Sequence, residues 1–177
     1  MNNIVFHQVR SNQEKSIAAS LIREYLEFLN LRIKRDYEIE FDLDAMVDSD
    51  VRDESKFHPP SGRFYLVTCN DKICGIGCLK KIDDGIAEIQ RMYVTPESRG
   101  MGIGRAIANQ LINDAKSVGY QRLKLESLRF LEAAHSLYRS LGFKEINPYA
   151  DNSMKSFQAE DQLDTYYSIT VFMEMTL

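Results

Sequence analysis

Arg99-Gly100-Met101-Gly102-Ile103-Gly104, hereafter the glycine stretch, decides the fold of this chain. An apolar, strand-like run at residues 86–94 precedes it, and a helical pattern at residues 105–116 follows it. Glycines at alternate positions leave a row of backbone N–H groups uncovered by side chains. The helix N-terminus behind them adds partial positive charge. The glycine stretch therefore predicts a binding site for a phosphate or pyrophosphate.

The spacing of the glycines shows which of the common phosphate-binding motifs the chain can contain. A P-loop needs Lys followed by Ser or Thr after its glycines, but Arg105-Ala106 stands there. A dinucleotide fingerprint needs its third glycine one position later than Gly104. Glu126 lies about 20 residues further on, where a ribose-binding acid is expected, and this keeps a dinucleotide-binding domain open as an alternative. The pattern that remains is Arg-x-x-Gly-x-Gly, formed by Arg99, Gly102 and Gly104.

The hydrophobic pattern on both sides of the glycine stretch predicts a single α/β domain over residues 1–177. Short apolar runs between turn-like segments indicate strands, and apolar residues at helical spacing indicate helices. Strands are expected at residues 4–9, 64–69, 73–82, 86–94, 123–126, 143–146 and 169–176. Helices are expected at residues 12–35 with Asn12 as N-cap, 43–51, 105–118 and 131–141. Residues 147–167 are expected to form a loop near the functional site. Residues 86–94 and 123–126 should pair in parallel, with the ligand at their carboxyl ends.

The composition fits an ordinary soluble protein, with 44% hydrophobic and 27% charged residues. A net charge of −4 argues against a general nucleic-acid binder. No apolar run approaches the ~20 residues of a membrane span, and the first residues do not resemble a signal peptide. We therefore expect a cytoplasmic protein. Cys74 and Cys78 should share one strand face beside Cys69, as buried thiols rather than a zinc site, with an acyl-cysteine as the alternative.

Several segments, taken in order, resemble the GNAT superfamily of acetyl-coenzyme A-dependent N-acetyltransferases. They are residues 87–94, the glycine stretch, Leu137-Tyr138 and Leu141-Gly142-Phe143. Residues 145–149, Asn152 and residues 172–174 further resemble bacterial members that have no assigned substrate. The resemblance implies a mixed, mostly antiparallel sheet of about six to seven strands flanked by helices. A splayed parallel pair in that sheet would hold the coenzyme.

The resemblance also implies how acetyl-coenzyme A binds. A backbone N–H near Met92 would face the thioester oxygen, where negative charge grows in the transition state. Leu131 stands where many members carry an asparagine that contacts the pantetheine arm, so that contact is missing here. The pyrophosphate is expected on the backbone of Arg99, Gly100, Met101, Gly102, Ile103, Gly104 and Arg105, and the pantetheine along Met92, Tyr93 and Val94.

Two side chains occupy positions at which the family places its proton-transfer groups. Glu88 stands where several members carry the general base, and a solvated or ion-paired strand carboxylate is the alternative. A water chain to another carboxylate, such as Glu126, would serve as well. Tyr138 stands at the general-acid position, and packing on the apolar helix face is the alternative. His135 is interpreted as an exposed helix histidine, with proton shuttling as the alternative.

The resemblance implies direct attack by a primary amine of a small molecule or a peptide, with no metal. The acidic residues between 42 and 50 either attract a cationic acceptor or form the wet side of a helix. A non-catalytic acetyl-coenzyme A sensor is the alternative, although the presence of both Glu88 and Tyr138 favours an enzyme. The final strand offers an edge for a homodimer, although the oligomeric state stays open. The acceptor-binding candidates are Tyr25, Glu126, Tyr149 and Asn152.

Overall fold

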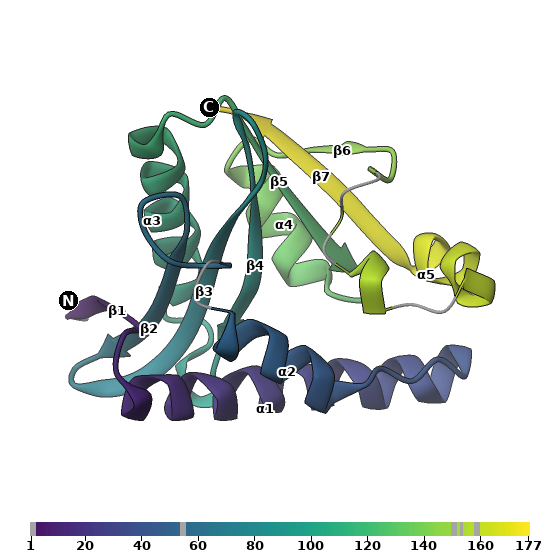
Figure 1. Ribbon diagram of the computed structural model, residues 1–177, viewed down its shortest axis with the longest axis horizontal. Helices are drawn as coiled ribbons and strands as arrows, with labels where there is room; N and C mark the ends of the chain where they lie inside the picture. Colours follow the sequence, from purple (N-terminus) through teal and green to yellow (C-terminus); the bar gives the residue numbers. More distant parts are fainter. Residues whose placement is uncertain (1–2, 54–55, 150–151, 153, 158–159) are drawn as a thin grey trace.

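The computed structural model describes residues 3–53, 56–149, 152, 154–157 and 160–177 (Figure 1). The strands are β1 (Ile4–Gln8), β2 (Arg63–Cys69), β3 (Lys72–Asp83), β4 (Ile86–Val94), β5 (Arg122–Leu128), β6 (Lys144–Ile146) and β7 (Thr170–Thr176). The helices are α1 (Asn12–Tyr37), α2 (Leu43–Arg52), α3 (Ile103–Val118), α4 (Glu132–Ser140) and α5 (Leu163–Ile169), with short 3-10 turns at Pro96–Ser98, Lys155–Phe157 and Glu160–Gln162.

The strands form one seven-stranded sheet in the order β1-β2-β3-β4-β5-β7-β6. Neighbouring strands are antiparallel except β4 and β5, which run parallel. The mixed, mostly antiparallel sheet predicted from the sequence is therefore confirmed. The final strand β7 lies between β5 and β6 instead of at an edge, so the edge expected for a homodimer is wrong. Strand β6 takes the edge because its short segment pairs with β7 alone among the described strands.

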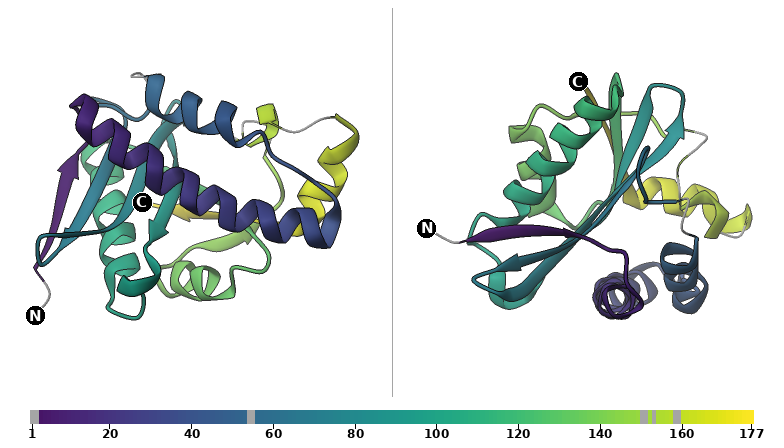
Figure 2. Two further views of the ribbon diagram at one scale, coloured as in Figure 1. Left: turned by 90° about the horizontal axis from the view of Figure 1, so that it is seen from below. Right: turned by 60° about the vertical axis from the view of Figure 1, so that its left-hand side comes forward.

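Each face of the sheet has its own hydrophobic core. Helices α1, α2 and α5 cover one face, hereafter the α1 face, and helices α3 and α4 cover the other, hereafter the α3 face (Figure 2). On β3, Gly75 and Gly77 let α3 approach closely, because a Cβ at Gly77 would lie 2.5 Å from a methyl group of Ile107. This approach fixes the helix that follows the glycine stretch against the centre of the sheet.

A β-bulge in β4 changes which side chains point to each face. Ile76 of β3 pairs with Tyr93, but Cys78 pairs with Gln90, so β4 holds one extra residue there. Arg91 in this bulge has a left-handed backbone with φ 49°. Ala87 and Ile89 belong to the core of the α3 face, and strict alternation would send Arg91 and Tyr93 there too. Instead Tyr93 joins the core of the α1 face, and Met92 packs on the α3 face.

Strands β4 and β5 separate just where the bulge begins. Their parallel register runs from Ile86↔Arg122 to Ile89↔Leu125 and stops there. Strand β5 continues to Leu128, paired with β7 on its other side. The carboxyl ends of the parallel pair therefore open beside the N-terminus of α3, as the sequence predicted.

Two expectations about helices and loops need correction. Ser11 rather than Asn12 caps α1, because Ser11 and Glu14 form a reciprocal capping box. The expected loop at 147–167 contains two 3-10 turns and the start of α5, whose buried Tyr166 and Ile169 pack on the sheet. These elements form because of tertiary burial, which the polar sequence of this segment does not indicate.

The cysteines do not share one face as expected. The register of β2 with β3 skips Cys74, which lies in a bulge between Ile73 and Gly75. Cys74 therefore packs on the α3 face with Cys69, and Cys78 packs on the α1 face. All three thiols are buried and free, and burial raises the pKa of Cys74 to about 11.

Candidate functional site

A pocket of about 510 Å³, hereafter the loop pocket, opens beside the glycine stretch. Gly102 begins α3 as its N-cap with φ 79°, a left-handed conformation that glycine adopts at no steric cost. Met101 of the predicted set does not line the loop pocket and is 43% exposed. Of the residues predicted to bind the coenzyme, Met92, Tyr93, Val94, Arg99, Gly100, Gly102, Ile103, Gly104 and Arg105 do line it.

Two arginines bring positive charge to the mouth of the loop pocket. The Nε atom of Arg99 donates to the carbonyl of Val94 over 3.2 Å, and its guanidinium stacks 5.9 Å from the ring centre of Phe28. Arg105 donates to the hydroxyl of Ser140 over 2.8 Å. Together with the start of α3, these groups favour an anionic ligand at this end of the pocket.

Aromatic and aliphatic side chains also line the loop pocket. Phe28 of α1 meets Phe130 in an edge-to-face contact with ring centres 6.3 Å apart. Leu131, which stands where the family often has asparagine, lines the pocket together with Leu137. The loop pocket therefore combines cationic side chains and the start of α3 with aromatic and aliphatic surface.

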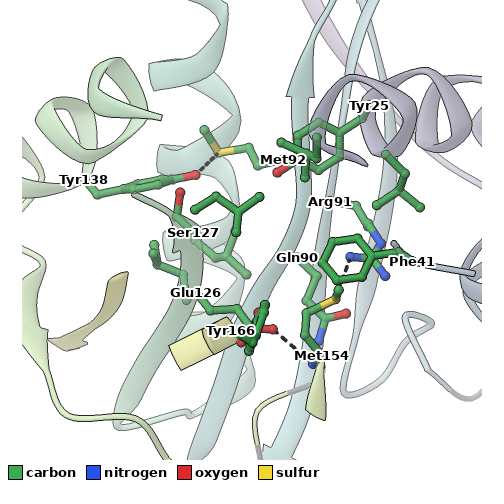
Figure 3. Close-up of a pocket in the computed structure, with 15 residues that line it drawn as sticks. Tyr25, Phe41, Gln90, Arg91, Met92, Glu126, Ser127, Tyr138, Met154 and Tyr166 are labelled. Carbon is green, nitrogen blue, oxygen red and sulfur yellow. Dashed lines mark hydrogen bonds between the residues drawn. The ribbon is translucent and has the colours of Figure 1, made fainter. Parts of the chain in front are cut away.

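A second space, hereafter the central cavity, has a volume of about 60 Å³ and lies where β4 and β5 separate (Figure 3). Tyr25 and Met92 line both the central cavity and the loop pocket. A ligand held in the loop pocket would therefore meet a ligand in the central cavity at these two side chains.

The central cavity is bounded by side chains from both faces of the sheet. Tyr138 of α4 belongs to the core of the α3 face, and Tyr166 of α5 belongs to that of the α1 face. Glu126 is hydrogen-bonded to Tyr166, and the adjacent Ser127 is bonded to α4, so the two residues point to opposite faces. The gap between β4 and β5 thus places a carboxylate from one face and a phenol from the other on the wall of one cavity.

Glu126 provides the carboxylate of the central cavity. Its Oε2 accepts a hydrogen bond from the Tyr166 hydroxyl over 3.1 Å, and its Oε1 accepts one from the Met154 backbone N–H over 3.1 Å. Burial, followed by the nearby charge of Glu88, raises the pKa of Glu126 to about 8. A carboxyl group tuned this close to neutral pH is suited to accept and release a proton.

Glu88 is fully buried and does not line the central cavity. The Tyr149 hydroxyl donates to its Oε1 over 2.5 Å, and the Gln90 side-chain amide donates to its Oε2 over 2.6 Å. Burial, followed by the charge of Glu88, raises the pKa of Tyr149, so its phenol stays protonated and keeps donating. Glu88 therefore lies outside the wall of the central cavity, and its charge acts on Glu126.

Tyr138 is buried, with its hydroxyl directed to the sulfur of Met92 over 3.8 Å (Figure 3). Its ring packs edge-to-face on Phe143. Burial raises the pKa of Tyr138, so the phenol remains protonated at neutral pH. Tyr138 thus places a proton donor beside Met92, where the two pockets meet.

Tyr25 lines both pockets, but the other acceptor candidates are divided. Tyr149 contacts Glu88 and does not line the central cavity. Asn152 is buried and bonds local backbone instead, donating to the Tyr149 carbonyl over 2.8 Å and accepting from the Lys155 N–H over 2.9 Å. Asn152 therefore shapes the segment that brings Met154 to the cavity.

His135 is buried, contrary to the exposed position expected. One of its ring nitrogens, Nε2, lies 3.1 Å from the hydroxyl of Ser127, which lines the central cavity. Burial, followed by the charge of Arg139, lowers the pKa of His135, so the ring is neutral at pH 7. The helical pattern around His135 did not indicate this burial, because the partner Ser127 lies on β5 and not on the same helix.

Asp50 is also buried, although it was expected to belong to the wet side of α2 or to attract a cationic acceptor. Its two carboxylate oxygens bind Lys56 and Arg91, and the side chains of both partners are 7% exposed. Arg91 lines the central cavity, so Asp50 ties α2 to the bulge in β4. Nothing in the local sequence distinguished Asp50 from its exposed acidic neighbours.

Sequence reasoning missed other residues around the central cavity because its wall is assembled from separate segments. Gln90, Met154 and Tyr166 come from β4, a loop and α5, and no motif links them. The described residues hold no group of three or more His, Cys, Asp or Glu side chains arranged for a metal ion. Within the described part of the chain, no helix has the length and apolar character needed to cross a membrane.

Comparisons with known proteins point in one direction. The model of the "Acetyltransferase (GNAT) family" matches residues 26–143. The chain is 30% identical over 158 residues to an uncharacterized N-acetyltransferase of Schizosaccharomyces pombe, covering 85% of this chain and 89% of that protein. It is similar in fold to an acetyltransferase from Streptococcus agalactiae, with TM-score 0.71, 19% identity and 98% of both chains covered. It is also similar to the PaiA N-acetyltransferase from Thermoplasma acidophilum in complex with coenzyme A, with TM-score 0.65, 18% identity and 99% of both chains covered.

Proposed function

The chain belongs to the GNAT family of acetyltransferases, and on that premise we propose that it transfers an acetyl group from acetyl-coenzyme A to a primary amine by direct attack. The family and the mostly antiparallel sheet leave no support for the dinucleotide-binding alternative. Acetyl-coenzyme A is the co-substrate best supported, because the loop pocket combines cationic side chains beside the start of α3 with apolar surface.

The single observation that carries this proposal is the junction of the two pockets at Tyr25 and Met92. We place the pyrophosphate at the glycine stretch and the acetyl thioester beside Met92. The amine would enter the central cavity next to Glu126. The reacting nitrogen and carbonyl carbon would then be neighbours, which is the arrangement that direct transfer requires.

Glu126 accepts a proton from the ammonium group of the acceptor, because an alkylammonium has a pKa near ~10 and no free lone pair. The freed nitrogen forms a bond to the acetyl carbon, and backbone N–H groups at the Arg91 bulge stabilise the oxyanion. The carbon–sulfur bond then breaks, and Tyr138 gives its proton to the leaving sulfur. Loss of the second amine proton completes the amide and restores a proton for the phenol.

A matched pair of glycine variants tests the site of the pyrophosphate. Gly102 and Gly119 stand at opposite ends of α3 with φ 79° and 96°, and a Cβ at either meets nothing within 4 Å. Alanine at either position costs about 1–2 kcal/mol of stability because of the left-handed backbone. We expect Gly102→Ala alone to weaken coenzyme A binding, by about tenfold for one lost hydrogen bond to a charged group. Calorimetric titration measures this, and equal affinity in both variants would place the pyrophosphate elsewhere.

Removing the hydroxyl of Tyr138 tests the proton donor. Tyr138→Phe keeps the ring contact with Phe143, so the fold and coenzyme affinity should not change. We expect kcat to fall about 10²-fold because the thiolate leaves without a proton. Steady-state thiol release and coenzyme titration measure the two quantities. An unchanged kcat would show that Tyr138 packs in the core and does not donate the proton.

The activity itself is tested by mixing the protein with acetyl-coenzyme A and a panel of amines and following free thiol. Thiol release that depends on the amine, with the acetylated amine identified by mass spectrometry, is the expected result. Tight binding of acetyl-coenzyme A without thiol release for any amine would favour the sensor alternative. The cytoplasmic location, the single domain over residues 1–177 and a homodimer stay predictions.

A further inference from the structure

The central cavity limits the size of what can enter it. Benzene needs a cavity of roughly 150 Å³. The volume of about 60 Å³ therefore holds a ligand part with about two or three non-hydrogen atoms. The loop pocket, at about 510 Å³, lies within the ~300–1,000 Å³ range of ordinary ligand pockets. The space for the acceptor is thus much smaller than that for the donor.

The charges on the wall restrict the acceptor further. Among the described residues that line the central cavity, Glu126 and Arg91 are the charged ones. Arg91 is already bound to Asp50, and its Nη1 contacts the sulfur of Met154 over 3.7 Å. Glu126 therefore remains to meet one ammonium group. A second charge on the acceptor would lose its water without a matching partner on these residues, which is strongly unfavourable.

The rest of the wall favours a cation with an apolar body. Four aromatic rings border the cavity, and Figure 3 shows Phe41 and Tyr166 near its α1 side with Tyr138 across from them. Aromatic faces attract an ammonium group, and Leu26 and Leu29 of α1 offer aliphatic surface to its carbon chain. The described rings are those of Tyr25, Phe41, Tyr138 and Tyr166.

We propose that the acceptor is a compact, free monoamine with an apolar body of about two carbons, and not an amino acid, a diamine or a peptide. This inference rests on the proposed acetyl transfer and names its substrate class. Leu29 sets the length limit, because it lines the cavity from α1 and is only 7% exposed.

A series of straight-chain amines from methylamine to octylamine tests the length limit through kcat/KM. We expect kcat/KM to rise about fourfold per methylene until the cavity is filled, and to fall beyond about two or three carbons. Butane-1,4-diamine, an amino acid and a lysine-containing peptide serve as comparison acceptors. Each should be at least tenfold poorer than the best monoamine.

Leu29→Ala removes three side-chain carbons, so the preferred amine should become longer by two or three carbons. Leu21→Ala is the matched control, because Leu21 is equally buried on the same helix and does not line the cavity. It should leave the preferred length unchanged. If Leu29→Ala does not fold, Leu29→Val should move the optimum by about one carbon.

The outcomes distinguish a failure of this inference from a failure of the proposed acetyl transfer. Equal or better kcat/KM for the diamine, amino acid or peptide overturns the monoamine class. An optimum that stays in place in both Leu29 variants, or moves equally in Leu21→Ala, overturns the assigned length limit. Absence of thiol release with every acceptor overturns the acetyl transfer itself, and this inference with it.

Discussion

Replacing Glu126 by glutamine is expected to lower kcat/KM for the amine by about 10³-fold at pH 8, because the cavity loses its proton acceptor. The native carboxyl has a pKa of about 8, raised by burial and then by the charge of Glu88. It is protonated and inactive below that pH and becomes a base above it, so the native rate should rise through pH 8. The variant should lose this inflection and keep only that of the amine near ~10.

The raised pKa of Glu126 also predicts how the stability of the protein depends on pH, and this provides a control for Glu126→Gln. The carboxyl pKa is raised from 4.5 to about 8 in the folded protein, so the folded state holds a proton that the unfolded chain releases between these values. The native protein should therefore lose stability as pH rises from 5 to 9. The glutamine variant should not share that loss, so its Tm at pH 9 should equal or exceed the native one. A low rate together with a low Tm would indicate misfolding instead.

Two further variants decide whether Glu126 or Glu88 is the base. Glu145→Gln is the matched surface control, because Glu145 lies on edge strand β6 and pairs with exposed Arg139. It should leave the rate and its pH profile unchanged. Glu88→Gln should move the inflection to lower pH, since it removes a charge that raises the pKa of Glu126. An inflection near pH 8 that survives in Glu126→Gln and vanishes in Glu88→Gln would assign the base to Glu88.

Asp50→Ala is expected to cost about 3–5 kcal/mol of unfolding free energy, because it leaves buried cations without their carboxylate. Asp50 binds Lys56 and Arg91, all with side chains 7% exposed or less. Burial already lowers the pKa of Lys56. Losing Asp50 removes an interaction that keeps Lys56 charged, so the deficit should shrink as pH rises and Lys56 becomes neutral. Urea unfolding at pH 7 and pH 10 measures both effects.

Asp48→Ala is the matched control on the same helix. Asp48 pairs with Arg52 over 3.1 Å, but the two side chains are 55% and 78% exposed. Such a surface pair contributes less than about 1 kcal/mol. If Asp50→Ala and Asp48→Ala lower the free energy of unfolding by equally small amounts, the buried network does not hold α2 to β4. Because Arg91 forms the bulge beside the central cavity, Asp50→Ala should also lower kcat in the fraction that remains folded.

The parts of the fold that were predicted correctly depend on local patterns. Apolar residues recur along each strand and helix at the spacing that its geometry requires, so β4 and the order of elements around the glycine stretch followed from the sequence. The N-cap of α1 was misplaced by one residue, although the Ser-x-x-Glu pattern of Ser11 and Glu14, which forms the capping box, is present in the sequence. Helix α5 was missed because its burial against the sheet, rather than its own composition, stabilises it.

The sequence by itself therefore determined the family, the mixed and mostly antiparallel character of the sheet, and the glycine stretch before α3, because these arise from residues close together in the chain. Only the tertiary structure decided which carboxylate lines the central cavity. The bulge at Arg91 and the separation of β4 from β5 bring Glu126 to the cavity and leave Glu88 outside its wall. The burial of Asp50 and His135 was decided in the same way, because tertiary packing brings their partners Arg91 and Ser127 on β4 and β5 against α2 and α4. A pattern of neighbouring residues contains no information about such contacts, since strand register and packing create them.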